Sequence, residues 1–279
     1  DQVLPWIGEK VIQPLLKFVG SEEPKGLSIV ACGWLPLVPL HAAQVNLGGK
    51  ERRLLDVYPT RCSPSGAMLA ASLNRPSSVS EKRFVAIANP DGSLPVTEAE
   101  VHAVAGAVGS GEIAVGHEAT TSFFHEHVPT GSHLHFGCHA NGSLLRFSET
   151  GMKLSDGVLF ADEVAAISIR ARLAVASACQ TAIPEKLAAS DEAFSFANCL
   201  LAAGAKCVIA SHWRVHDVAA GILMVRFYDD PECLTDPIGS LRRAQLWMRD
   251  LTDDQLEIFL AENSSLRDEI QKVVDRLAK

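Results

Sequence analysis

Two residues at the ends of apolar segments, Cys179 and His139, have the chemistry and the positions needed for nucleophilic catalysis. Residues 173–178 (LAVASA) are small or apolar without interruption, which is typical of a strand covered on both faces, and Cys179 follows them directly. Residues 133–138 form a second strand-like run, which ends at His139. An open α/β sheet places its chemistry at the carboxyl ends of its strands, so the two could meet there as base and nucleophile. The alternative is two strand-end residues that never meet.

Several further histidines precede His139, and together they raise the alternative of a metal site. They are accompanied by a cysteine, and the group comprises His125, His127, His133, His135 and Cys138. Imidazole and thiolate groups bind zinc, but these spacings match no closed zinc site. Cys138 also points away from His139, because side chains alternate along a strand. We therefore expect no metal and no cofactor, and a zinc hydrolase remains an alternative that elemental analysis would test.

Residues 211–217 (SHWRVHD) follow another strand-like run and belong to the same expected edge of the sheet. Trp213 could form the wall of a substrate slot. Asp217 could be the anion at its base, where it would bind a basic side chain through charge-assisted hydrogen bonds. The alternative is that Asp217 simply caps the helix that follows.

The order of apolar segments predicts the elements that position these residues. Strands are expected at six places that alternate with helices, namely 27–32, 83–89, 112–116, 133–138, 172–178 and 206–211. This alternation is typical of an α/β fold with a mainly parallel central sheet and helices on both faces. Local signals add an amphipathic helix over 1–20, an edge strand from Leu54 to Thr60, a capping box of Thr97 with Glu100, and helix starts at Asp236 and Thr252.

Composition limits the class of protein. The 279 residues carry a net charge of −8 with a pI of about 5.7, which argues against direct nucleic-acid binding. Seven cysteines without a CxxC pair indicate a reducing compartment, and we expect the cytoplasm. No apolar stretch reaches the roughly 18 residues of a membrane span. Because the sequence begins with Asp, we expect it to be part of a longer protein.

Short segments along nearly the whole chain resemble the boxes of the CHAT domain. This is a caspase-like domain often joined to TPR repeats and related to caspases and separase in peptidase clan CD. Residues 135–139 (HFGCH) resemble its HFA-x-H-G box, and residues 177–181 (SACQT) resemble its SACET box. Five further segments are similar to family boxes in the same order: 35–40, 88–92, 116–120, 202–208 and 211–217. Three positions depart from the boxes, with Ala140 in place of Gly, Gln180 in place of Glu and His212 in place of Leu.

The resemblance implies a caspase-like three-layer sandwich formed by residues 1–279, with a smaller pseudo-caspase-like half at about 1–75 and a catalytic half at about 80–279. It implies a cysteine endopeptidase with His139 as general base and Cys179 as nucleophile. Backbone N–H groups of Ala140 and Cys179 would hold the oxyanion. Asp217 matches the acidic residue with which clan relatives bind Arg at P1. The substrate-binding set then comprises Asp217, Trp213, Ser177 and His212.

The resemblance also suggests how such a protein would act. Its substrate would be a protein or peptide with Arg or Lys at P1. The chain would be a regulated effector domain, controlled by an N-terminal sensor, a TPR region or a separate regulator. A rival interpretation is a non-catalytic caspase-like interaction module that keeps the fold. Labelling of Cys179 by a basic peptidyl chloromethyl ketone separates the two.

Overall fold

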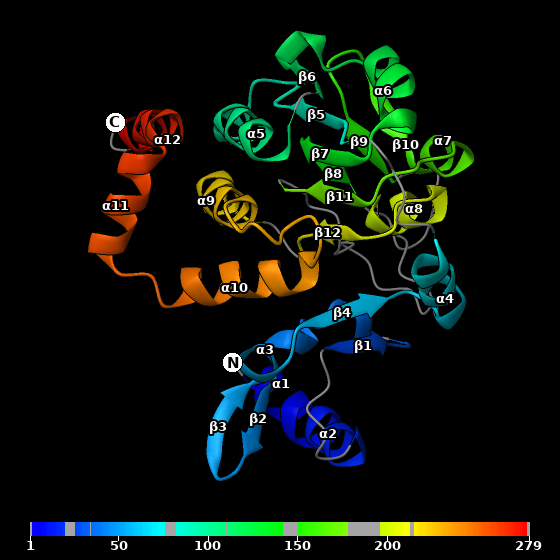
Figure 1. Ribbon diagram of the computed structural model, residues 1–279, viewed down its shortest axis with the longest axis vertical. Coiled ribbons are helices and arrows are strands. Elements are labelled where there is room, and N and C mark those ends of the chain that lie inside the picture. Colours follow the sequence, from blue (N-terminus) through cyan, green and yellow to red (C-terminus); the bar gives the residue numbers. More distant parts are fainter. Residues whose placement is uncertain are drawn as a thin grey trace.

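A five-stranded parallel sheet forms the centre of the computed structural model (Figure 1). The structure describes residues 2–19, 26–33, 35–75, 82–109, 111–141, 150–177, 196–212 and 215–277. The strand order is β12-β11-β7-β5-β6, and every neighbouring pair is parallel. The strands are β5 (Phe84–Ala88), β6 (Gly111–Val115), β7 (His133–Gly137), β11 (Leu173–Ala176) and β12 (Val208–Ala210).

Helices cover both faces of this sheet. One face packs against α5 (Pro95–Val108) and α9 (Asp217–Tyr228), and the other against α6 (Thr121–His127), α7 (Ala161–Ala166) and α8 (Phe196–Ala203). Every residue of β5, β7 and β11 is buried, including His133 and His135 of β7, as expected of strands that lie between two helical layers. The predicted α/β class, with a parallel sheet between helices, is confirmed and is consistent with a caspase-like fold.

Three smaller sheets and the remaining helices surround this centre. β1 (Leu27–Val30) pairs in parallel with β4 (Thr60–Ser63), β2 (Gln44–Leu47) pairs with β3 (Lys50–Arg53), and β8 (Ala140–Asn141), β9 (Gly151–Lys153) and β10 (Val158–Phe160) form an antiparallel sheet. The other helices are α1 (Val3–Ile7), the π-helical η1 (Gly8–Ile12), α2 (Gln13–Val19), α3 (Leu54–Val57), α4 (Gly66–Asn74), α10 (Pro237–Arg249), α11 (Asp253–Glu262) and α12 (Ser264–Leu277). None of the helices in the described ranges is long and apolar enough to cross a membrane.

Two sequence-based expectations for the N-terminal region were wrong. The strand predicted at 27–32 forms β1, but it pairs with β4 outside the central sheet, and its burial alternates because only one face packs on a core. The edge strand predicted from Leu54 to Thr60 is instead the short helix α3 followed by β4. The Asp56 carboxylate accepts a hydrogen bond from Arg53 N–H at 2.7 Å, and this turns the chain into a helix.

The helix starts predicted from capping residues were mostly correct. Asp236 caps α10 by accepting from Gly239 N–H at 3.1 Å, and Thr252 forms a capping box with Gln255 at the start of α11. The predicted box of Thr97 with Glu100 is wrong. Helix α5 begins earlier, at Pro95, and the Thr97 hydroxyl donates to the carbonyl of Leu94 at 2.7 Å.

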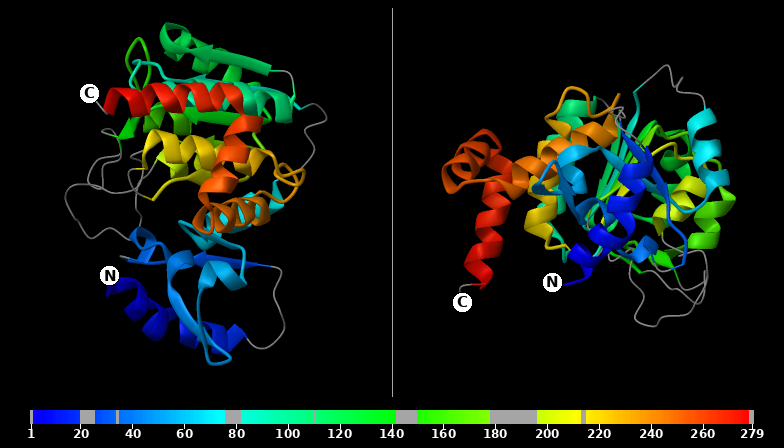
Figure 2. Two further views of the ribbon diagram at one scale, coloured as in Figure 1. Left: turned by 90° about the vertical axis from the view of Figure 1, so that its left-hand side faces the viewer. Right: turned by 90° about the horizontal axis from the view of Figure 1, so that it is seen from below.

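Helices α10 and α4 connect the N-terminal elements, α1 to β4, with the sheet (Figure 2). From α10, the Arg242 guanidinium donates to the carbonyls of Leu55 and Asp56 at 2.6 and 2.7 Å. Just after α4, Arg75 donates to the carbonyls of Leu201 and Ala205. These contacts are charge-assisted and partly buried, so they fix the lower edge of the sheet to the N-terminal elements.

A buried polar network joins the central strand to its helices. Nε2 of His135 on β7 lies 2.8 Å from Oε1 of Glu100 on α5, and both side chains are fully buried. The other ring nitrogen, Nδ1, lies 3.4 Å from the Tyr228 hydroxyl of α9. Such a network specifies how strand and helices pack, and it is costly to leave half satisfied.

We predict that Glu100→Ala lowers the free energy of unfolding by about 3 kcal/mol, because it leaves the buried His135 ring without its acceptor. Glu100→Gln keeps an acceptor and should cost less. Urea denaturation measures both, with Glu112→Ala, an exposed position on β6, as the control expected to change little. A Glu100→Ala value within about 0.5 kcal/mol of the wild type would contradict this role for the network.

Candidate active site at the carboxyl edge of the central sheet

The strands that precede His139 and Cys179 are direct neighbours. β7 and β11 are hydrogen-bonded in parallel, with Phe136 opposite Ala176, and Ser177 N–H continues the ladder to the carbonyl of Phe136 at 3.0 Å. His139 lies two residues beyond the end of β7. Cys179 itself, with residues 178–195, lies outside the described residues, so its pairing with His139 stays a prediction.

His139 is held by a serine and an aspartate from the segment that follows β5. Its Nε2 lies 2.8 Å from the Ser93 hydroxyl, and that hydroxyl lies 2.5 Å from Oδ1 of Asp91. Because a carboxylate only accepts, the serine donates to Asp91 and therefore accepts from Nε2–H of His139. This assigns the ring proton to Nε2 and leaves the lone pair on Nδ1, where a general base needs it.

The Asp91 carboxylate remains charged in this arrangement. Burial would raise its pKa, but hydrogen bonds from Ser93 and from the Lys153 ammonium, at 2.9 Å, outweigh burial and hold the pKa well below its usual range. An ionised carboxylate behind the serine favours a proton on the Nε2 side of His139. Among the described residues, the side chain of Ser93 is exposed and that of His139 is partly exposed.

Asn89 shapes the segment that carries Asp91 and Ser93. It follows β5 with a φ of 49°, and it is the one non-glycine residue with a positive φ among those the structure describes. Its buried side chain accepts from Leu94 N–H at 2.7 Å and donates to Glu98 at 2.6 Å. Asn tolerates this left-handed conformation better than most residues, and its amide closes the loop from inside.

Ala140, the expected oxyanion residue, lies on the edge strand β8. It is opposite Met152 of β9, and Lys153 N–H donates to the carbonyl of His139 at 2.8 Å. In an antiparallel ladder this makes Ala140 and Met152 a non-hydrogen-bonded pair, so the Ala140 N–H points away from β9. That orientation keeps the N–H out of the β8–β9 ladder.

Asp217 lies at the start of α9, but it caps a different helix from the one expected. His216 is the N-cap of α9, and Oδ2 of Asp217 accepts from Val96 N–H in the first turn of α5 at 3.1 Å. Its Oδ1 is buried and has no hydrogen-bond partner among the described residues. The alternative interpretation, in which Asp217 caps the helix that follows it, is therefore wrong.

Burial and, to a smaller extent, the nearby Glu100 raise the pKa of Asp217 to about 6, against the opposing effect of the hydrogen bond from Val96. The carboxyl group is thus close to its titration point at neutral pH and has one oxygen that can accept a new donor. Carboxylates with raised pKa values in partly buried positions are frequent at functional sites.

The remaining predicted site residues have separate positions. Ser177 is buried, and its hydroxyl makes no hydrogen bond within the described residues. The His212 ring lies 6.1 Å from the ring of His41 in the N-terminal elements, and burial lowers the pKa of His212. Trp213 lies outside the described residues.

The histidines that precede His139 have different partners. His135 binds Glu100, His133 lies 2.8 Å from the Ser132 hydroxyl, and His127 lies 3.4 Å from Arg83. Within the described ranges, no three His, Cys, Asp or Glu side chains come together as metal ligands.

Sequence reasoning missed the partners of His139. Residues 88–92 were matched to a family box, but Asp91 and Ser93 were not assigned to the site. The available signal was a pair of short polar residues directly after a buried strand, at the edge where catalysis was already expected.

Comparison with known proteins gives one result. No curated protein matches the chain. A family model described as the CHAT domain matches residues 1–271 of the 279, in agreement with the order of the sequence boxes and with the fold. The chain therefore belongs to the CHAT domain family, a caspase-like, peptidase-related module.

Proposed function

We propose that the chain is a cysteine endopeptidase that cleaves after a basic residue, with His139 as general base and Cys179 as nucleophile. The observation that carries the proposal is the contact of His139 Nε2 with Ser93, which leaves Nδ1 as the basic nitrogen. It is supported by the pairing of β7 with β11, because parallel neighbours end at the same edge.

In the proposed reaction, Nδ1 of His139 takes the proton of the Cys179 thiol, and the thiolate attacks the carbonyl carbon of the scissile bond. The N–H groups of Ala140 and Cys179 donate to the resulting oxyanion. Collapse expels the amine, which receives the proton from His139. Water, deprotonated by His139, then hydrolyses the thioester, releases the acid and restores the thiol.

Asp217 would select the P1 residue. An Arg or Lys side chain would bind the open Oδ1 in a partly dry pocket, where an ion pair is worth more than on the surface. Trp213, Ser177 and His212 would complete the walls of this pocket.

We further propose that the domain is a regulated cytoplasmic effector controlled by a TPR region, an N-terminal sensor or a separate regulator. Support comes from the family alone. Labelling of Cys179 by a basic peptidyl chloromethyl ketone, with and without such a protein, tests this. Equal labelling in both conditions would argue against control by that protein.

We predict that Cys179→Ala and His139→Ala each abolish cleavage of a peptide library with basic P1 residues, a loss of at least about 10³-fold. The matched control is Cys62→Ala, an exposed cysteine, which should leave cleavage unchanged. Cleavage by Cys179→Ala would disprove the assignment of the nucleophile. Absence of both wild-type cleavage and a ketone adduct would favour the non-catalytic interaction module.

For Asp217→Asn, we predict loss of the preference for Arg over its neutral isostere citrulline at P1. In the wild type, the ratio of the two kcat/KM values should fall as pH drops through about 6, because Asp217 becomes protonated and uncharged. The ratio cancels any effect of pH on the chemical steps, because both substrates share those steps. A wild-type ratio that stays constant from pH 5 to 8, or an unchanged preference in Asp217→Asn, would contradict the assignment.

Ser93→Ala should lower kcat/KM by about 10- to 100-fold, because His139 loses the acceptor that fixes its tautomer. Ser93→Thr keeps the hydroxyl and should retain most of the activity. Unfolding curves measured in parallel would show whether stability is unchanged. Activity of Ser93→Ala equal to that of the wild type would rule out a positioning role.

A further inference from the structure

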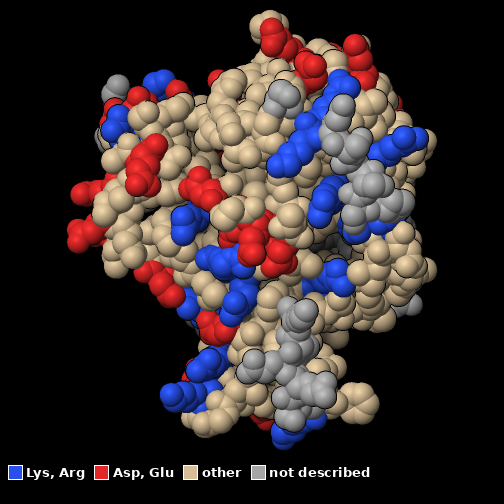
Figure 3. Space-filling view, viewed as in Figure 1, with Lys and Arg blue, Asp and Glu red and all other residues tan. Residues whose placement is uncertain are grey.

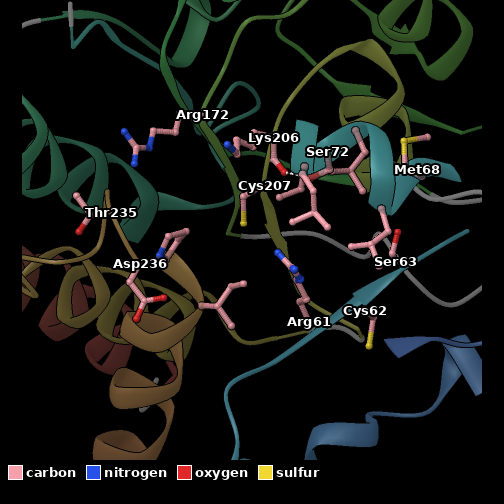
Figure 4. Close-up of a pocket in the computed structure, with 16 residues that line it drawn as sticks. Arg61, Cys62, Ser63, Met68, Ser72, Arg172, Lys206, Cys207, Thr235 and Asp236 are labelled. Atoms are coloured by element: carbon pink, nitrogen blue, oxygen red, sulfur yellow. Dashed lines mark hydrogen bonds between the residues drawn. The ribbon is translucent and has the colours of Figure 1, made fainter. Parts of the chain in front are cut away.

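A cavity of about 300 Å³ lies between the N-terminal elements and the central sheet. Figure 3 shows a hollow on this face of the molecule, between its lower and upper parts. One side of the lining comes from β4 and α4, and the other comes from the residues before β11 and β12 and from the start of α10 (Figure 4). Close packing is incomplete at this boundary, so the position of the N-terminal elements depends on individual contacts.

One such contact lies at the carboxyl edge of the sheet. Its partners are His212, two residues beyond the end of β12, and His41, which belongs to the 3-10 helix η3 (Leu40–Ala42) of the N-terminal elements. The ring centroids lie 6.1 Å apart, with 33° between the ring planes. This distance is within the range at which aromatic rings attract one another. The N-terminal elements therefore reach the segment that leads from β12 to Asp217.

Both rings are largely uncharged at neutral pH, so they pack without repulsion. Each ring is partly buried. Burial lowers the pKa of His212, and burial together with the neighbouring His212 lowers the pKa of His41 to about 4. His212 stands where the family box has Leu. An uncharged imidazole can pack at this position as an apolar side chain does, and it adds the ring contact with His41.

His41 belongs to a rigid part of the N-terminal elements. Its neighbours Leu40 and Ala43 are buried in the core of those elements. The carbonyl of Ala43 accepts a hydrogen bond from Leu54 N–H at 3.0 Å, at the start of α3. Helix α10 in turn holds α3 through the guanidinium of Arg242. The His41 ring is thus a fixed point on the side of the N-terminal elements.

The segment from His212 to Asp217 is held at both of its described ends. At its far end, Oδ2 of Asp217 accepts a hydrogen bond from Val96 N–H at 3.1 Å. Residues 213 and 214, within it, lie outside the described residues. If His212 were released, a substrate would have to order this segment on binding, and the cost of that ordering would reduce its affinity.

We propose that His41 is a positioning residue of the candidate active site, which holds His212 and, through it, the segment that leads to Asp217. The effect on a basic substrate rests on the proposed function, whereas the contact between the two rings does not. The N-terminal elements then contribute to substrate binding as well as to stability. Their displacement would weaken substrate binding without changing the chemical steps at His139 and Cys179.

Kinetics separate this positioning role from a general loss of structure. We expect His41→Ala to raise KM for a peptide with Arg at P1 at least about fivefold, with kcat within about twofold of the wild type. Alkylation of Cys179 by iodoacetamide should keep its rate, because this small reagent does not use the substrate segment. His41→Phe keeps an aromatic ring and should stay close to the wild type. The matched control is His125→Ala, at an exposed histidine on α6, which should change neither constant.

An unchanged KM in His41→Ala, or alkylation of Cys179 slowed as much as cleavage, would overturn the proposal. A second measurement needs no catalytic activity. NMR titration of the His212 ring should show its pKa rising in His41→Ala, because the ring becomes more exposed, and staying low in His41→Phe. An unmoved pKa would overturn the positioning contact whether or not the chain is a protease. A raised pKa without cleavage by the wild type would uphold the contact and contradict only the proposed function.

Discussion

The candidate site depends on the left-handed turn at Asn89. This residue lets the chain leave β5 sharply, and its amide then binds Leu94 N–H and Glu98 inside the loop. Its N–H donates to the carbonyl of Gly137 at 2.8 Å, which fixes the turn to the end of β7. A residue that disfavours positive φ would strain this turn, and one without the amide would leave buried partners unsatisfied.

From this turn, one short segment reaches both halves of the proposed site. Ser93 contacts His139, and three residues later Val96 N–H binds Asp217. Gly137 allows the close approach, since a side chain there would lie only 2.6 Å from Thr97. His139 and Asp217, the residues proposed as base and specificity residue, are thus positioned by the same loop and the first turn of α5, and a shift of that loop would move both.

The features of the fold and of the candidate site that could be predicted from the sequence are those set by local interactions. Strands β5 and β11 could be predicted because they are covered on both faces and their apolar runs have no gaps. Strand β7 could be predicted although two histidines interrupt its apolar residues. The position of β1 could not be predicted, because the residues LSIV are typical of a strand whichever strand they pair with.

His139 was recognisable at a strand end, but its contact with Ser93 depends on the backbone turn at Asn89. The capping of α5 by Asp217 arises from the packing of α5 against α9, which no local pattern reveals. Cys179 lies outside the described residues, so its role rests on sequence and family alone.

The state of Asp217 differs from that expected of a carboxylate that only caps a helix. A carboxylate whose task is only to cap a helix is stabilised when its oxygens are satisfied, and its pKa then falls. Asp217 has one oxygen on Val96 N–H and one without a described partner, while burial and Glu100 raise its pKa to about 6. The amino end of α5 stabilises the negative charge of Asp217, whereas burial and the nearby Glu100 destabilise it. A cation placed at the open oxygen would resolve this opposition. Under the proposed function, the energetic cost of the unpaired charge would then provide selectivity for a basic ligand over a neutral one.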